Sequence, residues 1–204
     1  MRRANIVFLA LGLLAAGAAQ AELRVFACEP EWAALAEELG GEHVEATSAI
    51  TGQQDVHYIQ ARPSLISGVR RADLVVCTGA DLEVGWLPLL IRQGGNPRVQ
   101  PGRPGYFEAA AFVDMKEVPQ RLDRAEGDIH PYGNPHIQID PHNIARVADA
   151  LAARLAQLDR ENADDYARRL EDFSTRWNAA IARWEQQAAT LAGKKFVTHH
   201  RSWV

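Results

Sequence analysis

The chain has 204 residues, of which 47% are hydrophobic and 24% are charged, so its composition is that of an ordinary globular protein. The formal net charge of −4 gives no reason to expect a nucleic-acid partner, and a mean hydropathy of −0.23 excludes a protein that crosses the membrane many times. Two cysteines are too few for a disulfide scaffold or for a four-cysteine zinc site.

The first 21 residues have the pattern of a secretory signal peptide. Arg2 and Arg3 form a positive start, residues 6–16 form a short apolar stretch, and residues 19–21 read Ala-Gln-Ala, a typical cleavage site. The apolar stretch is too short to cross a bilayer comfortably. We therefore expect cleavage after Ala21 and export of a soluble mature protein to the periplasm. No cysteine lies at the cleavage point, which argues against a lipid anchor.

Strands and helices alternate through the first part of the mature chain. The hydrophobic pattern and the turn residues predict strands at residues 23–28, 43–50 and 73–78, and a weak strand at residues 110–113. They predict helices at residues 29–39, 64–70 and 83–92, the last of them interrupted or started near Pro88, and a loop at residues 94–105. This alternation predicts an α/β fold, with a parallel sheet covered by helices, for an N-terminal lobe at residues 22–127.

Residues 142–192 contain neither glycine nor proline and have a helical period throughout. Asp140 is a suitable N-cap, and Pro141 suits the first helical position. A break near residues 159–162 leaves a second helix, residues 162–192, that would be about 46 Å long. A helix of this length is longer than one small lobe needs, so we expect it to link two lobes. A coiled-coil dimer is the alternative, which bulky tryptophans at two seam positions disfavour.

A further strand is predicted at Lys194–Thr198, and the sequence stops soon afterwards, at Val204. A lone strand is not stable. We therefore expect this strand either to join the first sheet or to be the beginning of an incomplete second lobe at residues 193–204.

The residues that suggest chemistry are the seven histidines. His57 lies in a polar loop after the second predicted strand, His136 lies just before the long helical stretch, and His199–His200 ends the last predicted strand. Ligands of open parallel α/β sheets bind beyond the carboxyl ends of the strands, where two of these three sites fall. Three imidazoles and one carboxylate would make a tetrahedral zinc site.

Each histidine also has a simpler interpretation as a solvated polar residue. We interpret His43, at the start of a strand, and His142, in a first helical turn, in this way. His130 lies six residues before His136 and is either a residue that recruits metal or plain surface. No HExxH or CxxC motif narrows the choice.

The sequence resembles the solute-binding proteins of zinc and manganese ABC importers. The resemblance lies in Asp55-Val56-His57 with Arg62-Pro63-Ser64, in the segment GNPHIQIDP at residues 133–141, in Leu158-Asp159 with Tyr166, and in Val197-Thr198-His199-His200. In that family the ligands lie in a D-x-H-like loop, in a P-H-x-x-x-D-P segment and at the end of a V-x-x-H strand. The resemblance therefore implies His57, His136 and His200 as metal ligands.

The same resemblance implies a function and two further segments. It implies periplasmic capture of a divalent metal ion and delivery to the membrane permease of an ABC importer. Residues 128–141 become an inter-lobe metal-site segment, and residues 142–192 become a helical segment with a long linking helix. Family members that favour manganese tend to have a carboxylate at the position of His200, so three histidines favour zinc over manganese. The family's fourth, acidic ligand lies beyond Val204, so the chain looks truncated in its second lobe.

The residues leave open the state of the two cysteines and, beside a metal-binding protein, two other classes of function. Cys28 and Cys77 each lie near the end of a predicted strand, and they form either a disulfide between neighbouring strands or two buried thiols. A zinc-dependent hydrolase would use the open fourth position for water, but no acid or base is identifiable near the histidines. A helical interaction protein is the third class. We expect a binding protein and not an enzyme.

Overall fold

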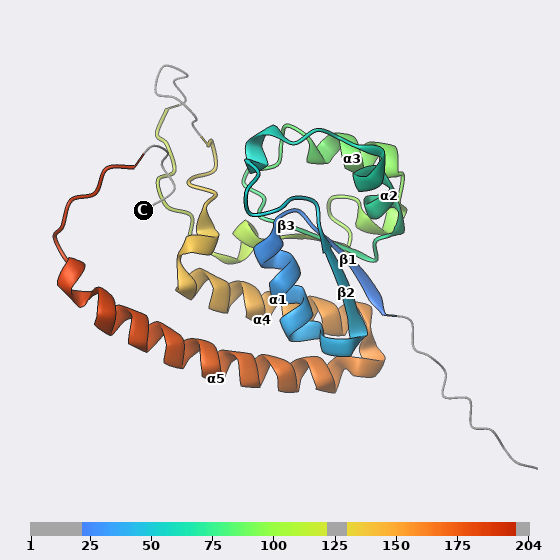
Figure 1. Ribbon diagram of the computed structural model, residues 1–204. Coiled ribbons are helices and arrows are strands. Elements are labelled where there is room, and N and C mark those ends of the chain that lie inside the picture. Colours follow the sequence, from blue (N-terminus) through green and yellow to red (C-terminus); the bar gives the residue numbers. More distant parts are fainter. Residues whose placement is uncertain (1–21, 122–129, 199–204) are drawn as a thin grey trace, which may run out of the picture.

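The computed structural model describes residues 22–121 and 130–198 and has the α/β architecture expected from the sequence (Figure 1). Four parallel strands form one sheet in the order β2-β1-β3-β4. The strands are β1 (Leu23–Ala27), β2 (Val44–Ser48), β3 (Leu74–Cys77) and β4 (Tyr106–Glu108). The helices are α1 (Pro30–Gly40), α2 (Pro63–Arg71), α3 (Leu87–Gly94), α4 (Pro141–Leu158) and α5 (Ala163–Ala188).

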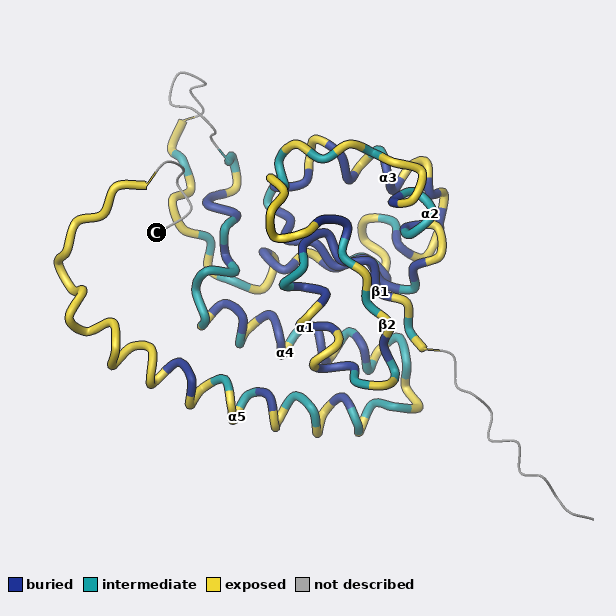
Figure 2. Tube along the Cα trace, in the orientation of Figure 1, coloured by how far each residue is buried: buried dark blue, intermediate teal, exposed yellow. Residues whose placement is uncertain are grey.

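Helices cover both faces of the sheet, because the two inner strands, β1 and β3, are largely apolar. Alternate residues of a strand point to opposite faces. On β1 and β3, one set packs with α1, α4 and α5, and the other set packs with α2 and α3. The tube in Figure 2 shows the resulting buried centre along the sheet and the inner sides of the helices. Both faces are therefore buried, as is usual for parallel sheets.

The fourth strand lies at a different place from the sequence prediction. The fourth strand is β4, and the predicted strand at residues 110–113 is wrong, because Ala109–Phe112 forms a 3-10 turn. Alanine is a poor strand former, whereas Tyr106 and Phe107 are good ones, and the Phe107 side chain is buried. Helix α3 begins at Leu87, with Pro88 in its first turn, which agrees with the predicted start near Pro88.

The helical stretch divides as predicted. The Asp140 carboxylate accepts a hydrogen bond from the His142 amide at 2.9 Å and caps α4, whose first residue is Pro141. The break falls at Asp159, which accepts hydrogen bonds from the Tyr166 hydroxyl and the Asn162 amide, each at 2.7 Å. Helix α5 then runs antiparallel along α4 and also packs on α1 (Figure 1). Its buried residues are Tyr166, Phe173, Ala180 and Ile181.

The prediction of a strand at Lys194–Thr198 is wrong. These residues have no regular secondary structure and are exposed, with Phe196 71% accessible. A strand needs a partner edge, and α5 carries this segment away from the sheet (Figure 1). The segment therefore does not join the first sheet. In the part of the chain that the structure describes, no helix is both long enough and apolar enough to span a membrane.

Cys28 and Cys77 form a disulfide between neighbouring strands, which decides the alternative that the sequence left open. Ala27 of β1 pairs with Val76 of β3, so the next residues along the two parallel strands lie side by side, with 4.8 Å between their Cα atoms. This separation is within the normal range for a disulfide. Both cysteines are completely buried. The bond thus ties β1 to β3 at the carboxyl edge of the sheet.

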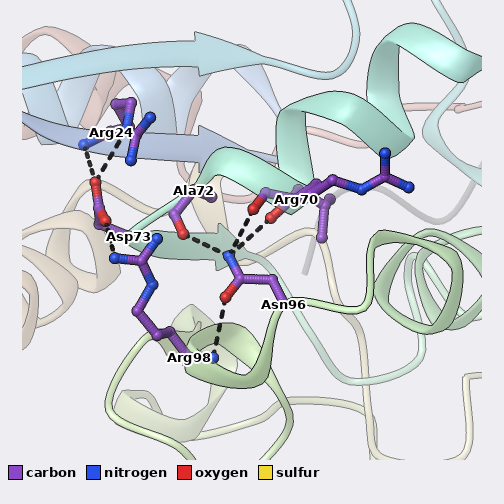
Figure 3. A network of polar contacts seen from close by, with 7 residues as sticks. Arg24, Arg70, Ala72, Asp73, Asn96 and Arg98 are labelled. Carbon is purple, nitrogen blue, oxygen red and sulfur yellow. Dashed lines mark hydrogen bonds and ion pairs between the residues drawn. The ribbon is translucent and has the colours of Figure 1, made fainter.

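A polar network ties the opposite, amino edge together (Figure 3). The Asp73 carboxylate pairs with Arg24 at 3.2 Å and with Arg98 at 2.8 Å. The buried Asn96 side chain, from the loop after α3, donates hydrogen bonds to three backbone oxygens at the end of α2, those of Val69, Arg70 and Ala72. These contacts fix the α2–β3 connection against the loop that leads to β4.

Candidate metal centre

His57 is held by a short 3-10 turn, Val56–Tyr58, at the carboxyl edge of the sheet. The Asp55 carboxylate accepts a hydrogen bond from the His57 amide at 3.0 Å. The buried Trp86 indole donates to the Val56 carbonyl at 2.8 Å, so the turn is fixed from both sides. This D-x-H arrangement orients the ring because the aspartate caps the turn that carries it.

His136 is held by a second capped turn, just before α4. Its amide donates to the Asn134 side-chain oxygen at 3.0 Å, and residues Ile137–Ile139 then form a 3-10 turn. Asn134 is itself fixed, since its backbone amide donates to the Lys116 carbonyl at 2.8 Å and its side chain donates to Glu117 at 3.1 Å. The His136 ring is therefore placed by contacts with residues 116–117 as well as by the turn that follows it.

The structure brings His57, His130 and His136 together. Each offers one ring nitrogen, and these nitrogens lie within 4.8 Å of one another. The ring centres of His57 and His130 are 5.3 Å apart, and that of His136 is 5.8 Å from His57 and 6.0 Å from His130. All three side chains are half-buried. Of the two alternatives for His130, the structure therefore supports a place beside the candidate ligands over plain surface.

The other histidines divide into two groups. His199 and His200 lie outside the described residues, so the position of the third predicted ligand is not part of the structure. His142 faces solvent as expected, with its Nε2 atom 3.0 Å from a Glu185 carboxylate oxygen. The interpretation of His43 as a solvated residue is wrong. Its side chain is mostly buried, and Nε2 lies 3.0 Å from an Asp165 carboxylate oxygen, because the start of α5 packs over this turn.

Two buried acids at the same edge of the sheet were not identified from the sequence as a pair. Glu29 follows β1, Glu83 follows β3, and both are almost completely buried. The amides of Thr78 and Gly79 donate to Glu83, at 2.7 Å and 3.1 Å, and the Thr78 hydroxyl donates to Glu29 at 3.1 Å. The only sequence signal was an acid soon after each of two buried strands.

Burial raises the pKa of both acids. The pKa of Glu29 lies well above its usual range because burial and the neighbouring Glu83 charge both oppose ionisation. Burial also raises the pKa of Glu83, to about 7, against the opposing effect of its hydrogen bonds. Since the backbone amides of Thr78 and Gly79 stabilise a carboxylate on Glu83, Glu29 is the member of the pair that more readily keeps its proton.

Glu83 stabilises a strained turn that reaches the His57 segment. Gly79, Ala80 and Asp81 all have positive φ, which is costly for the two residues with side chains. The hydrogen bonds from Thr78 and Gly79 to Glu83 hold this turn. The chain then continues to Trp86, whose indole fixes the carbonyl before His57. The buried acids are thus connected to the candidate metal ligands through one short segment.

Cys28, Cys77 and Glu83 also lie close together, with one candidate ligand atom of each within 4.8 Å of the others. They do not form a second metal site, because a sulfur ligand must be a thiolate and both sulfurs here are bonded in the disulfide. Among the described residues, the histidine cluster is therefore the group of donors that is suited to a metal.

A parallel α/β lobe with histidines gathered beyond its strand ends has a place for a ligand where such sheets bind theirs, and its donors suit a metal ion, as in a metal-binding solute-binding protein. The comparison with known families agrees. The family model described as zinc-uptake complex component A periplasmic (ZnuA) matches residues 25–204, and the chain belongs to this family. The family is one of metal-uptake components and not of enzymes, so the hydrolase alternative has no support.

Curated relatives are similar over most of the chain. The metal ABC transporter substrate-binding lipoprotein ScbA of Streptococcus cristatus is 22% identical over 177 residues, which are 85% of this chain and 54% of the relative. The manganese ABC transporter substrate-binding lipoprotein PsaA of Streptococcus anginosus is 23% identical over 156 residues, 75% of this chain and 47% of the relative. The chain thus spans about half the length of the curated relatives it matches.

Solved structures share the fold. A zinc-bound deletion mutant of ZnuA superimposes with a TM-score of 0.75 at 24% identity, over 89% of this chain and 64% of that one. The manganese-bound periplasmic metal-binding protein from Candidatus Liberibacter asiaticus gives a TM-score of 0.62 at 17% identity, over 83% of this chain and 58% of that one. At these identities the likeness establishes the α/β fold and its arrangement.

Proposed function

We propose that this protein captures zinc outside the cytoplasm and delivers it to the membrane permease of an ABC importer, with His57, His136 and His200 as ligands. The observation that carries the proposal is the convergence of the His57 and His136 rings, 5.8 Å apart, from two separately capped turns. Membership of the zinc-uptake family supports it independently. His200 enters from the sequence motif alone, because it lies outside the described residues.

Zinc is the cargo that the donor types favour. Neutral imidazoles are good ligands for borderline-soft metals in tetrahedral sites, whereas manganese is better served by carboxylates and water. Manganese is the second candidate, because relatives such as PsaA of Streptococcus anginosus carry manganese in their names. Manganese prefers oxygen ligands, and the three proposed histidines supply nitrogen ligands.

Export is the second part of the proposal. The family description places its members in the periplasm, and residues 1–21 have the pattern of a signal peptide that is cleaved after Ala21. Intact-mass analysis of protein recovered from the periplasm tests this, because cleavage predicts Glu22 as the first residue. Recovery of protein that still carries Met1 would contradict the export of a soluble form.

Competitive titration with a chromophoric chelator tests the ligands. We expect His57→Ala, His136→Ala and His200→Ala each to weaken zinc binding by at least about 100-fold, since loss of even an outer-shell partner commonly costs about 10–100-fold. His142→Ala is the matched control, because this residue is exposed and pairs with Glu185. Titration with manganese in parallel decides between the metals. Small and equal effects of all four substitutions would mean general surface binding.

A further inference from the structure

The ring positions of the histidine cluster match those of three imidazoles on one metal ion. With a Zn–N distance of about 2.05 Å and a ring centre about 1.1 Å behind each nitrogen, tetrahedral geometry places ring centres about 5.2 Å apart. The observed separations of 5.3, 5.8 and 6.0 Å are close to this value. Nitrogens on one zinc are about 3.3 Å apart. Donor atoms that already lie within 4.8 Å of one another would need only a small adjustment.

His130 reaches this position through contacts of its own segment. The Gly133 amide donates to the His130 carbonyl at 3.2 Å and closes a tight turn. Gly133 has φ of 105°, and a Cβ atom there would lie 2.7 Å from the Lys116 carbonyl oxygen. The turn is thus pressed against residues 115–118 in a way that only glycine allows. The same segment holds His136, so His130 and His136 are presented together to His57.

Two ring nitrogens of the cluster are also withdrawn from water. The Nε2 atoms of His57 and His130 are buried within the cluster, although both residues are only half-buried overall. A cluster in which two of three imidazoles have a sheltered nitrogen forms a better cation site than three solvated loop histidines. A metal bound there would lose little to competition from solvent, apart from its open fourth position.

We propose that His57, His130 and His136 bind one zinc ion with three imidazoles, and that His130 is a metal ligand in its own right. The inference rests on the proposed function and deepens it. It places a complete three-nitrogen site within residues 57–136, with the fourth position open to water or to a donor from elsewhere in the chain. Zinc can then be held by this lobe before any ligand beyond residue 198 engages.

A double-mutant comparison on the full chain tests the proposal, with zinc as the probe. In a His200→Ala background we expect His130→Ala to weaken zinc binding by at least about 100-fold, as much as His57→Ala does in that background. His142→Ala, added to the same background, should leave the affinity unchanged. His130→Gln provides a variant of similar size, and circular dichroism checks that each variant is folded.

X-ray absorption on the zinc-loaded His200→Ala protein supplies a second readout. We expect scattering from three imidazoles, falling to two on addition of His130→Ala. If His57→Ala and His136→Ala weaken binding whereas both substitutions of His130 do not, then His130 is not a ligand and this inference is wrong while the proposed function stands. If none of the histidine substitutions changes zinc affinity, the proposed function itself fails.

Discussion

The Cys28–Cys77 disulfide should make a large part of the stability of the lobe depend on oxidation. The bond joins residues 49 positions apart, and it is completely buried between the two central strands. For a loop of this size the chain-entropy relation gives a stabilisation of about 4 kcal/mol, through restriction of the unfolded chain. In a domain of this length each kcal/mol shifts the melting temperature by about 2–4 °C, so reduction should lower it by about 8–16 °C.

The assay compares thermal unfolding of the oxidised chain with that of chain reduced in denaturant and refolded with a thiol reductant present. Thiol titration in denaturant shows whether both cysteines are free. The control is the Cys28→Ala/Cys77→Ala variant, which should melt at the same temperature with and without reductant. If the fully reduced chain melts within about 2 °C of the oxidised one, the bond does not stabilise the fold and the loop-entropy argument is refuted for this protein.

Three further predictions concern polar contacts. Asn96→Ala should lower the free energy of unfolding, measured in urea, by at least about 2 kcal/mol, because it leaves buried carbonyls without their donor. The control is Arg98→Ala, at the exposed end of the same network, which should lower it by less than about 1 kcal/mol. Burial raises the pKa of Glu83 from 4.5 to about 7, so the folded state binds more protons than the unfolded state between these pH values. The stability of the folded state should therefore fall as the pH rises through this range. In urea unfolding at several pH values, the free energy of unfolding should fall less for Glu83→Gln than for the unchanged protein. Trp86→Phe removes the hydrogen bond behind His57 and should weaken zinc binding by about tenfold in the chelator titration; unchanged affinity would mean that the turn is held without it.

Local sequence patterns determined most of the secondary structure. An aspartate followed by proline began α4, glycines ended α1, and short, mainly apolar runs marked β1 and β3, because each of these signals acts within one turn or one strand. The predictions were wrong at the weak strand near residue 110 and at Lys194–Thr198. A strand forms only where a neighbouring edge accepts its hydrogen bonds, and the sequence does not say where that edge lies.

The sequence also indicated the chemistry of the candidate site, since the motifs around His57 and His136 identified two histidines that the structure brings together. Only the tertiary structure decided which other residues join or support them. His130 lies beside the two candidates because a glycine turn presses against residues 115–118, and Glu29 meets Glu83 because their two strands are neighbours. His43 similarly gained its partner from α5, more than a hundred residues further along the chain. Such contacts depend on how elements pack, which no local pattern records.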